Sequence, residues 1–218
     1  MKFKSNPKIK ICGIRTLEDV GIVNEFLPEF VGFVLAESKR RVDIETLKTL
    51  IEKLDKKIQP VGVFVNETYD GILRAIEAGI KVLQLHGDEK PDYIYNLKMS
   101  MEDNNISIWK AIRVDDARIS NQIFDFGDID AVVLDKYSKK QFGGTGEAFN
   151  WEIVRKINIS YPIILAGGLN SDNVQTAVSI ANPWCVDVSS GVEENNKKDK
   201  ELIKRFIKNI RKDESNAK

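Results

Sequence analysis

Short apolar segments alternate along the chain with longer segments whose apolar residues are spaced as on one face of a helix. The apolar segments are continuous rather than interrupted by polar residues, which is typical of parallel strands buried on both faces of a sheet. We therefore predict eight strands: a first one that ends with Ile9, Ile11 and Cys12, then Phe30–Leu35, Pro60–Val65, Val82–His86, Ile106–Ile112, Ala131–Asp135, Pro162–Ala166 and Trp184–Val188.

Helical patterns follow the predicted strands, and two of them begin at residues that suit a helix start. Thr16 with Asp19 three positions later resembles a capping box for a helix through Asn24. Asp43 is placed to cap a long helix over 44–54. Further helices are expected over 67–77, from about 91, near 151–156, over 174–181 and over about 200–211, with only a weak pattern after the fifth strand.

Eight strands, each followed by a helical pattern, predict an α/β protein built as one (β/α)₈ barrel, the TIM barrel. A doubly wound parallel sheet is the competing arrangement, because strand segments alone do not show closure. No GxGxxG follows the first strand, which weakens a dinucleotide-binding interpretation. No linker divides the chain, so we expect a single domain over 1–218, with an N-terminal extension at 1–7 and a polar tail at 212–218.

Composition and charge narrow the class of partner. The 218 residues include 33 Lys and Arg against 33 Asp and Glu, so nothing favours a nucleic acid or an anionic membrane as a partner. No segment reaches the ~20 apolar residues of a membrane span, and no secretory pattern opens the chain. Two cysteines, Cys12 and Cys185, are too few for a disulfide framework. We expect a cytoplasmic protein.

Glycine and serine residues end the last two predicted strands. Gly167-Gly168 follows the seventh strand, and Ser189-Ser190-Gly191 follows the eighth. Bare backbone N–H groups at such turns suit a phosphate dianion, and the loops after strands seven and eight of a barrel commonly bind phosphate. A second glycine loop, which contains Gly143 and Gly144, could close over a ligand or be a mere turn.

Other chemistry-bearing residues also stand at strand ends, where the active site of a barrel lies. Cys12 ends the first strand, and a thiol with a lowered pKa could act as a base or a nucleophile there. Asp135 ends the sixth strand after four apolar residues, and a carboxylate rarely ends a buried strand unless it has an interaction partner or a function. Each also has a structural alternative: a small buried hydrophobe for the cysteine, a cap or salt bridge for the aspartate.

Three further positions are less specific. His86, the single histidine, ends the fourth strand and could shuttle a proton, bind a substrate or be purely structural. Asp187 lies inside the eighth strand and could orient another polar group, contact a substrate or be structural. Arg40 or Arg41 could bind a carboxylate or a phosphate if its side chain faces the barrel mouth. No metal-ligand spacing is present, and we expect neither metal nor cofactor. The residues by themselves indicate an enzyme that acts on a phosphorylated metabolite through proton transfers, as in an isomerisation.

Seven stretches in this order resemble the phosphoribosylanthranilate isomerases of tryptophan biosynthesis. The resemblance covers about 8–210, and each stretch is modest when taken alone. The stretches are KICGI at 10–14, GFVLAESKRRV at 32–42, VGVFVN at 61–66, LQLHGDE at 83–89, VLDKYSKKQFGGTGEAFNW at 133–151, LAGGLNSDNV at 165–174 and VDVSSGVE at 186–193.

The resemblance implies a (β/α)₈ barrel and an Amadori rearrangement of N-(5-phosphoribosyl)anthranilate to 1-(2-carboxyphenylamino)-1-deoxyribulose 5-phosphate. It implies Cys12 as the general base, Asp135 as the general acid and Arg40 as the ligand of the anthranilate carboxylate, with Arg41 as the alternative. It places the phosphate on the loops after strands seven and eight, with Gly143 and Gly144 nearby.

Two departures from the family pattern are visible, and several alternatives stay open. The chain reads ENNKKDK after Glu193, where Pro-Gly is common, and Arg15 replaces a threonine or similar residue. Rival functions are indole-glycerol-phosphate synthase, whose strand-end lysine and paired glutamates we do not find, a metal-dependent pentulose-phosphate epimerase, and a non-catalytic phosphosugar-binding barrel. The sequence does not decide between a monomer and a homodimer, nor whether the related histidine-pathway aminoaldose is also a substrate.

Overall fold

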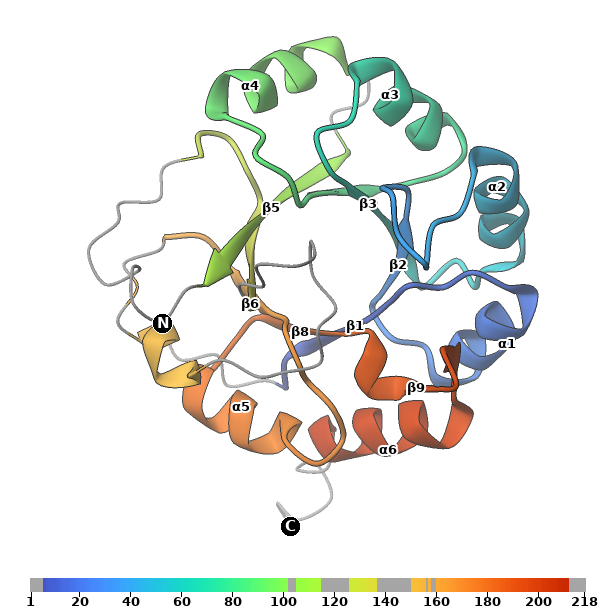
Figure 1. Ribbon diagram of the computed structural model, residues 1–218, viewed down its shortest axis with the longest axis vertical. Helices are drawn as coiled ribbons and strands as arrows, with labels where there is room; N and C mark the ends of the chain where they lie inside the picture. Colours follow the sequence, from blue (N-terminus) through green and yellow to red (C-terminus); the bar gives the residue numbers. More distant parts are fainter. Residues whose placement is uncertain are drawn as a thin grey trace.

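Eight parallel strands close into a barrel in the computed structural model, with β1 paired to β2 on one side and to β8 on the other (Figure 1). The structure describes residues 6–101, 105–114, 126–136, 150–155, 157 and 160–211. Closure confirms the predicted (β/α)₈ barrel and excludes the doubly wound sheet. The strands are β1 (Lys8–Cys12), β2 (Phe30–Val34), β3 (Gln59–Phe64), β4 (Val82–Leu85), β5 (Ser107–Val114), β6 (Ala131–Lys136), β7 (Ile163–Leu165) and β8 (Cys185–Val188).

Helices surround the barrel, as Figure 1 shows, and they begin largely where the sequence predicts. Thr16 and Asp19 form the expected capping box, and Asp43 accepts from the backbone N–H of Thr46. Near Trp151 the expected helix is a 3₁₀ turn, η1 (Trp151–Arg155). The α-helices are α1 (Leu17–Phe26), α2 (Ile44–Lys53), α3 (Tyr69–Glu77), α4 (Pro91–Ser100), α5 (Val174–Ala181) and α6 (Lys200–Ile210). The weak helical pattern after the fifth strand lies outside the described residues.

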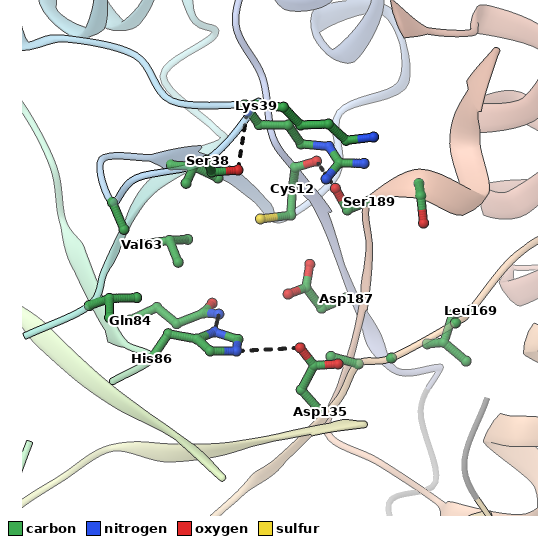
Figure 2. A pocket seen from close by; sticks show the side chains of 18 of the residues that line it. Cys12, Ser38, Lys39, Val63, Gln84, His86, Asp135, Leu169, Asp187 and Ser189 are labelled. Atoms are coloured by element: carbon green, nitrogen blue, oxygen red, sulfur yellow. Dashed lines mark hydrogen bonds and ion pairs between the residues drawn. The ribbon is translucent and has the colours of Figure 1, made fainter. Parts of the chain in front are cut away.

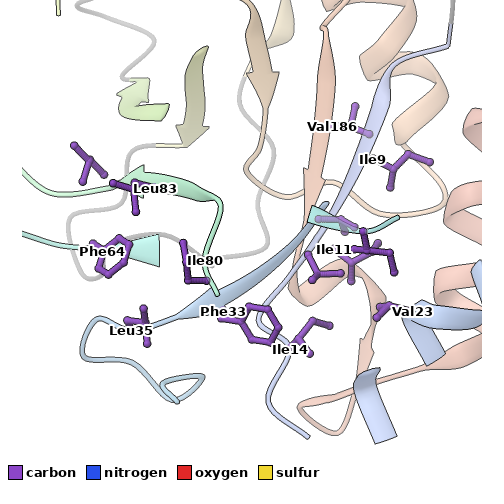
Figure 3. Packing of buried hydrophobic residues seen from close by; sticks show 14 of the residues in the cluster. Ile9, Ile11, Ile14, Val23, Phe33, Leu35, Phe64, Ile80, Leu83 and Val186 are labelled. Atoms are coloured by element: carbon purple, nitrogen blue, oxygen red, sulfur yellow. The ribbon is translucent and has the colours of Figure 1, made fainter. Parts of the chain in front are cut away.

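Two apolar layers cover the two faces of the barrel. The outer layer packs strand side chains such as Ile9, Ile11 and Phe33 against helix side chains such as Val23 (Figure 3). This double burial explains why the strand segments of the sequence are continuously apolar. A separate inner cluster fills the barrel: Phe30, Val61, Val82, Trp109, Ala111, Ala131, Val133, Ile164, Ala166 and Cys185.

Aromatic rings and a lysine fill the end of the barrel where the strands begin. The rings of Phe30 and Trp109 meet edge to face with centroids 4.9 Å apart, and Trp184 packs on both. The Lys8 ammonium lies 4.6 Å from the Trp184 ring centroid, a distance that suits a cation–π contact. Because these side chains fill this end, a ligand that enters the barrel would do so from the opposite end, where the strands finish.

Candidate functional site

A cavity of about 420 Å³ lies at the end of the barrel where the strands finish, a usual size for a small-molecule site. Alternate strand residues face it, because successive side chains of a strand point into and out of a barrel. Nine of the twelve predicted site residues line the cavity: seven come from five strand ends or the loops beyond them, and the other two form the Gly167-Gly168 turn. The lining residues from the prediction are Cys12, Arg40, His86, Asp135, Gly167, Gly168, Asp187, Ser189 and Ser190.

The Cys12 thiol sits at the cavity wall, at the last residue of β1. Only 9 % of the residue is exposed, and burial raises the pKa of its thiol; the nearby Lys10 ammonium acts in the opposite direction. The ligand-free protein therefore lacks the lowered thiol pKa that would make Cys12 a ready base or nucleophile. The cause of the raised pKa is desolvation, which disfavours the thiolate and depends on how side chains pack around the end of the strand.

A buried ion pair lies directly below the thiol. Lys10 is 0 % exposed, and its Nζ is 2.7 Å from Oδ2 of Asp187, its partner in the register of β1 and β8. Burial lowers the pKa of the Lys10 ammonium, but the charges of Asp187 and Cys12 outweigh burial and raise it. Oδ1 of Asp187 has no hydrogen-bond partner among the described residues, and the carboxylate points into the cavity (Figure 2). Such an orphaned acceptor is costly unless a ligand donates to it.

Asp135 and His86 face each other across the cavity wall (Figure 2). Nε2 of His86 is 3.3 Å from Oδ2 of Asp135, and Nδ1 of His86 is 3.1 Å from Nε2 of Gln84. With the Gln84 amide as the donor, the imidazole carries its proton on Nε2 and presents it to Asp135. The two contacts place the imidazole of His86 between Gln84 and the Asp135 carboxyl group.

The structure separates the two arginines after β2. Arg40 is buried and lines the cavity, and its Nε and Nη2 donate to the two carboxylate oxygens of Glu193 at 2.8 and 2.7 Å. The Glu193 hydrogen bonds raise the pKa of the Arg40 guanidinium. Arg41 is exposed and pairs with Glu37, and unlike Arg40 it is not among the residues that line the cavity. Of the two, only Arg40 is placed to meet a ligand.

The loops after β7 and β8 touch each other at the cavity. Gly167 and Gly168 have φ values of 80° and 70°, which favour glycine. A Cβ atom on Gly191 would lie 1.9 Å from the carbonyl oxygen of Leu169, so a side chain there would push the two loops apart. Gly191 thus brings the loops together without lining the cavity itself. Gly143 and Gly144 lie outside the described residues.

Four residues of the site were not singled out in the sequence. Lys10 and Gln84 lie two positions before Cys12 and His86, so the two-residue strand period places each on the same barrel face as its neighbour. Glu193 and Lys198 lie beyond β8 and have no such signal. Within the described residues, no group of three or more His, Cys, Asp or Glu side chains could hold a metal ion. The described helices include none of the length and apolarity that crossing a membrane needs.

Known proteins resemble this chain in sequence and in fold. The family model described as N-(5'phosphoribosyl)anthranilate (PRA) isomerase matches residues 9–209. The N-(5'-phosphoribosyl)anthranilate isomerase of Thermoanaerobacter sp. (strain X514) is 46% identical over 205 residues, which cover 94% of this chain and 98% of that protein.

Two solved structures extend the comparison to three dimensions. A structure of monomers of the dimeric phosphoribosylanthranilate isomerase of Thermotoga maritima has a TM-score of 0.79 and 32% identity, and covers 94% of this chain and 99% of that one. A phosphoribosylanthranilate isomerase in complex with reduced 1-(o-carboxyphenylamino)-1-deoxyribulose 5-phosphate has a TM-score of 0.76, 32% identity and the same coverage. The chain therefore belongs to the N-(5'-phosphoribosyl)anthranilate isomerase family, and it converts N-(5'-phosphoribosyl)anthranilate to 1-(2-carboxyphenylamino)-1-deoxyribulose 5-phosphate in tryptophan biosynthesis.

Proposed function

We propose that Cys12 is the general base and Asp135 the general acid of this isomerisation. The observation that carries the proposal is their common cavity: the two side chains come from β1 and β6 and line it together with the glycine and serine loops after β7 and β8. A ribose held by its phosphate at those loops extends between a thiol and a carboxyl group. No other pair of described cavity residues combines a thiol with a carboxyl group held by a histidine.

The proposed steps use only proton transfers. Asp135 protonates the ring oxygen of the ribose, the bond between this oxygen and C1 breaks, and the anthranilate nitrogen supplies the electron pair of a protonated Schiff base. Once the thiol proton has passed to solvent, Cys12 as thiolate removes the proton from C2, and the electron pair of that bond forms the enolamine. Tautomerisation yields the ketone. Each general acid–base group typically contributes about 10²–10⁴-fold to the rate.

The raised pKa of the Cys12 thiol fits a base that acts only on the intermediate. Burial keeps the thiol protonated in the empty cavity, which protects it from side reactions. The Schiff base is a cation formed within the same cavity, and a nearby positive charge favours the thiolate. The Lys10 ammonium contributes in the same direction before the substrate arrives.

Arg40 is proposed to bind the anthranilate carboxylate. A guanidinium presents N–H groups along two edges, and Glu193 occupies only the edge formed by Nε and Nη2. The edge that includes Nη1 is available for a bidentate contact with a second carboxylate. The exposed position of Arg41 argues against it in this role.

The phosphate is proposed to bind at the loops after β7 and β8, where backbone N–H groups and the serine hydroxyls can donate to it. This group consists of Gly167, Gly168, Ser189 and Ser190 at the cavity, with Gly191 behind them. Gly143 and Gly144 are also proposed to lie near the phosphate, on the family resemblance alone.

His86 and Asp187 are proposed to support the ribose and the acid. The 3.3 Å approach of His86 Nε2 to Asp135 orients the acid toward the ring oxygen. The unpartnered Oδ1 of Asp187 suits a ribose hydroxyl, because a hydroxyl donor would satisfy a buried acceptor that the protein itself leaves open.

Alkylation of Cys12 by iodoacetamide tests the assignment of the base. We expect the rate to rise with pH, with a midpoint above the ~8.5 of an ordinary cysteine, because thiolate is the reactive form and burial raises the pKa. Reduced product analogue should protect the thiol. Mass spectrometry of the two cysteine peptides gives the rates, and the fully buried Cys185, whose pKa burial raises well above the usual value, serves as the internal control. Labelling that is independent of pH, or unaffected by the analogue, would contradict the proposal.

Gly32→Ala tests whether the position of the Cys12 sulfur matters. A Cβ atom at Gly32 would lie 2.6 Å from Sγ of Cys12 and 3.2 Å from its Cα, so the sulfur must move. We expect kcat to fall about tenfold or more, because a displacement of about 1 Å can cost up to ~10²-fold. Gly21→Ala in α1, where a Cβ atom meets nothing within 4 Å, is the matched control and should leave kcat unchanged. Equal kcat values for both variants would argue against the sulfur as the base.

The dimeric relative from Thermotoga maritima supports a homodimer, and a monomer is the alternative. We propose a cytoplasmic location, which agrees with free thiols at both cysteines. The partner that matters for the chemistry is the phosphosugar substrate.

A further inference from the structure

A small hairpin follows the loop after β8 and reaches over to the loop after β2. Its strands are β9 (Glu193–Glu194) and β10 (Lys197–Lys198), and it turns at Asn195 and Asn196, whose φ values are 49° and 60°. Asparagine is well suited to such a left-handed two-residue turn. The pairing places Lys198 directly opposite Glu193.

Glu193 holds two cations at once. Its carboxylate accepts from Arg40 at 2.8 and 2.7 Å and from Nζ of Lys198 at 2.7 Å, and all three side chains are nearly inaccessible to solvent. Burial raises the pKa of the Glu193 carboxyl group, but the hydrogen bonds of Arg40 and the charge of Lys198 outweigh burial and lower it to about 2. Glu193 is therefore ionised at any pH at which the enzyme would be assayed.

The three charges do not cancel. Two cations and one carboxylate give the cluster a net charge of one positive unit (2 − 1), and an uncompensated buried charge is unfavourable. One further anion would balance the cluster. The carboxylate of the substrate supplies that charge, and the free edge of the Arg40 guanidinium supplies the donors.

The hairpin is fastened to the other parts of the site. Nζ of Lys198 donates to the carbonyl of Ser189 at 3.1 Å, and the Ser189 hydroxyl donates to the carbonyl of Cys12 at 3.0 Å. At the turn, Nζ of Lys39 donates to Oδ1 of Asn196 at 2.7 Å, and the Arg15 guanidinium donates to the Asn196 carbonyl. Arg15 and the Asn-Asn turn, the two departures from the family pattern, thus contact each other.

We propose that Glu193, held by Lys198, is a positioning residue that orients the Arg40 guanidinium toward the carboxylate of the substrate. The inference rests on the proposed role of Arg40 in binding this carboxylate. Arg40 has a long side chain with many rotamers, and the bidentate contact with Glu193 selects one before substrate binds. The conformational entropy of the Arg40 side chain is then lost when the protein folds rather than when the substrate binds.

The test compares two ligands, the reduced product analogue and its counterpart without the carboxylate. The measured quantity is the Kd of the counterpart without the carboxylate divided by the Kd of the reduced product analogue. It is obtained by calorimetry for the wild type and each variant, and a high ratio means that the carboxylate contributes strongly to binding. A positioning role predicts that Glu193→Gln lowers this ratio at least about tenfold, as expected when a charge-assisted contact is lost. A purely electrostatic role of Glu193 predicts a higher ratio in Glu193→Gln, because removing a negative charge strengthens the attraction of the site for the carboxylate. A merely structural role predicts weaker binding of both ligands and an unchanged ratio.

Glu193→Asp keeps the charge and shortens the side chain, so it should also lower the ratio, because the bidentate geometry is lost. Glu194→Gln, the same chemical change at the exposed neighbouring residue, is the matched control and should leave the ratio unchanged. A wild-type or higher ratio in both Glu193 variants would overturn the inference. If Glu193→Gln does not fold, the result for Glu193→Asp alone decides.

Arg40→Met separates the inference from the function on which it rests. The ratio should collapse in this variant, because the carboxylate ligand itself is gone. If it collapses while both Glu193 variants keep the wild-type ratio, Arg40 binds the carboxylate and Glu193 does not position it. If Arg40→Met keeps the wild-type ratio, the role of Arg40 in the proposed function is the part that fails.

Discussion

Replacing Cys12 with serine is expected to lower kcat by at least about 10²-fold while leaving substrate binding nearly unchanged. Serine has nearly the same shape, so the cavity keeps its form. Its hydroxyl is a far weaker acid than a thiol, so the alkoxide that would have to remove the C2 proton is not populated. The loss therefore falls on kcat, whereas the phosphate and carboxylate contacts that determine affinity stay in place.

The rate is measured from the loss of fluorescence of the anthranilate adduct, and affinity from calorimetry with the reduced product analogue. Cys185→Ala is the matched control, because this second cysteine also faces the barrel interior but lies in the inner apolar cluster below the cavity. Its kcat should equal that of the wild type. Near-normal turnover of Cys12→Ser would remove the thiol from the mechanism.

Asp135→Asn is expected to lower kcat by a similar factor, at least about 10²-fold. The amide has the size of the carboxyl group and can still approach His86 Nε2, so the geometry of the wall is kept. It has no proton of suitable acidity to give to the ring oxygen. The substrate should therefore bind and remain in its closed-ring form.

Asp130→Asn is the control for this variant. Asp130 comes just before β6, at the opposite end of that strand from Asp135, and its carboxylate accepts from the backbone N–H of Ile108 at 2.7 Å. Its replacement should affect stability slightly and kcat not at all. If Asp135→Asn turned over within a few-fold of the wild type, the proton for ring opening would have to come from another group, and His86 would be the nearest candidate.

The strands and the strand-end residues of the cavity could be read from the sequence because both follow from local patterns. Continuous apolar segments predict buried parallel strands, and the end of each segment identifies the residue at the mouth. Cys12 and Asp135 were found in this way, and the structure brings them to one cavity. The helix expected near Trp151 proved to be a 3₁₀ turn, since a short segment with two or three apolar residues does not distinguish the two.

The rest of the site depends on contacts between distant parts of the chain. Lys10 was overlooked because a fully buried lysine is rare, and only its ion pair with Asp187 explains it. Glu193 contacts Arg40 across 153 positions in the sequence, through a hairpin whose strands are only two residues long. Whether the pKa of the Cys12 thiol is raised or lowered depends on burial, which the identity of the residue alone does not reveal.

Lys10 and Asp187 are 177 positions apart in the sequence, so their ion pair can form only when the first strand meets the last. Closing so long a segment of chain has an entropic cost that the final pairing of β1 with β8 must offset. The same pairing brings the electrostatic partners of Cys12 beside it. A chain that ends before β8 therefore has the Cys12 thiol without the Lys10–Asp187 ion pair beside it. With Cys12 as the proposed base, the electrostatic surroundings of its thiol are complete only once the barrel has closed.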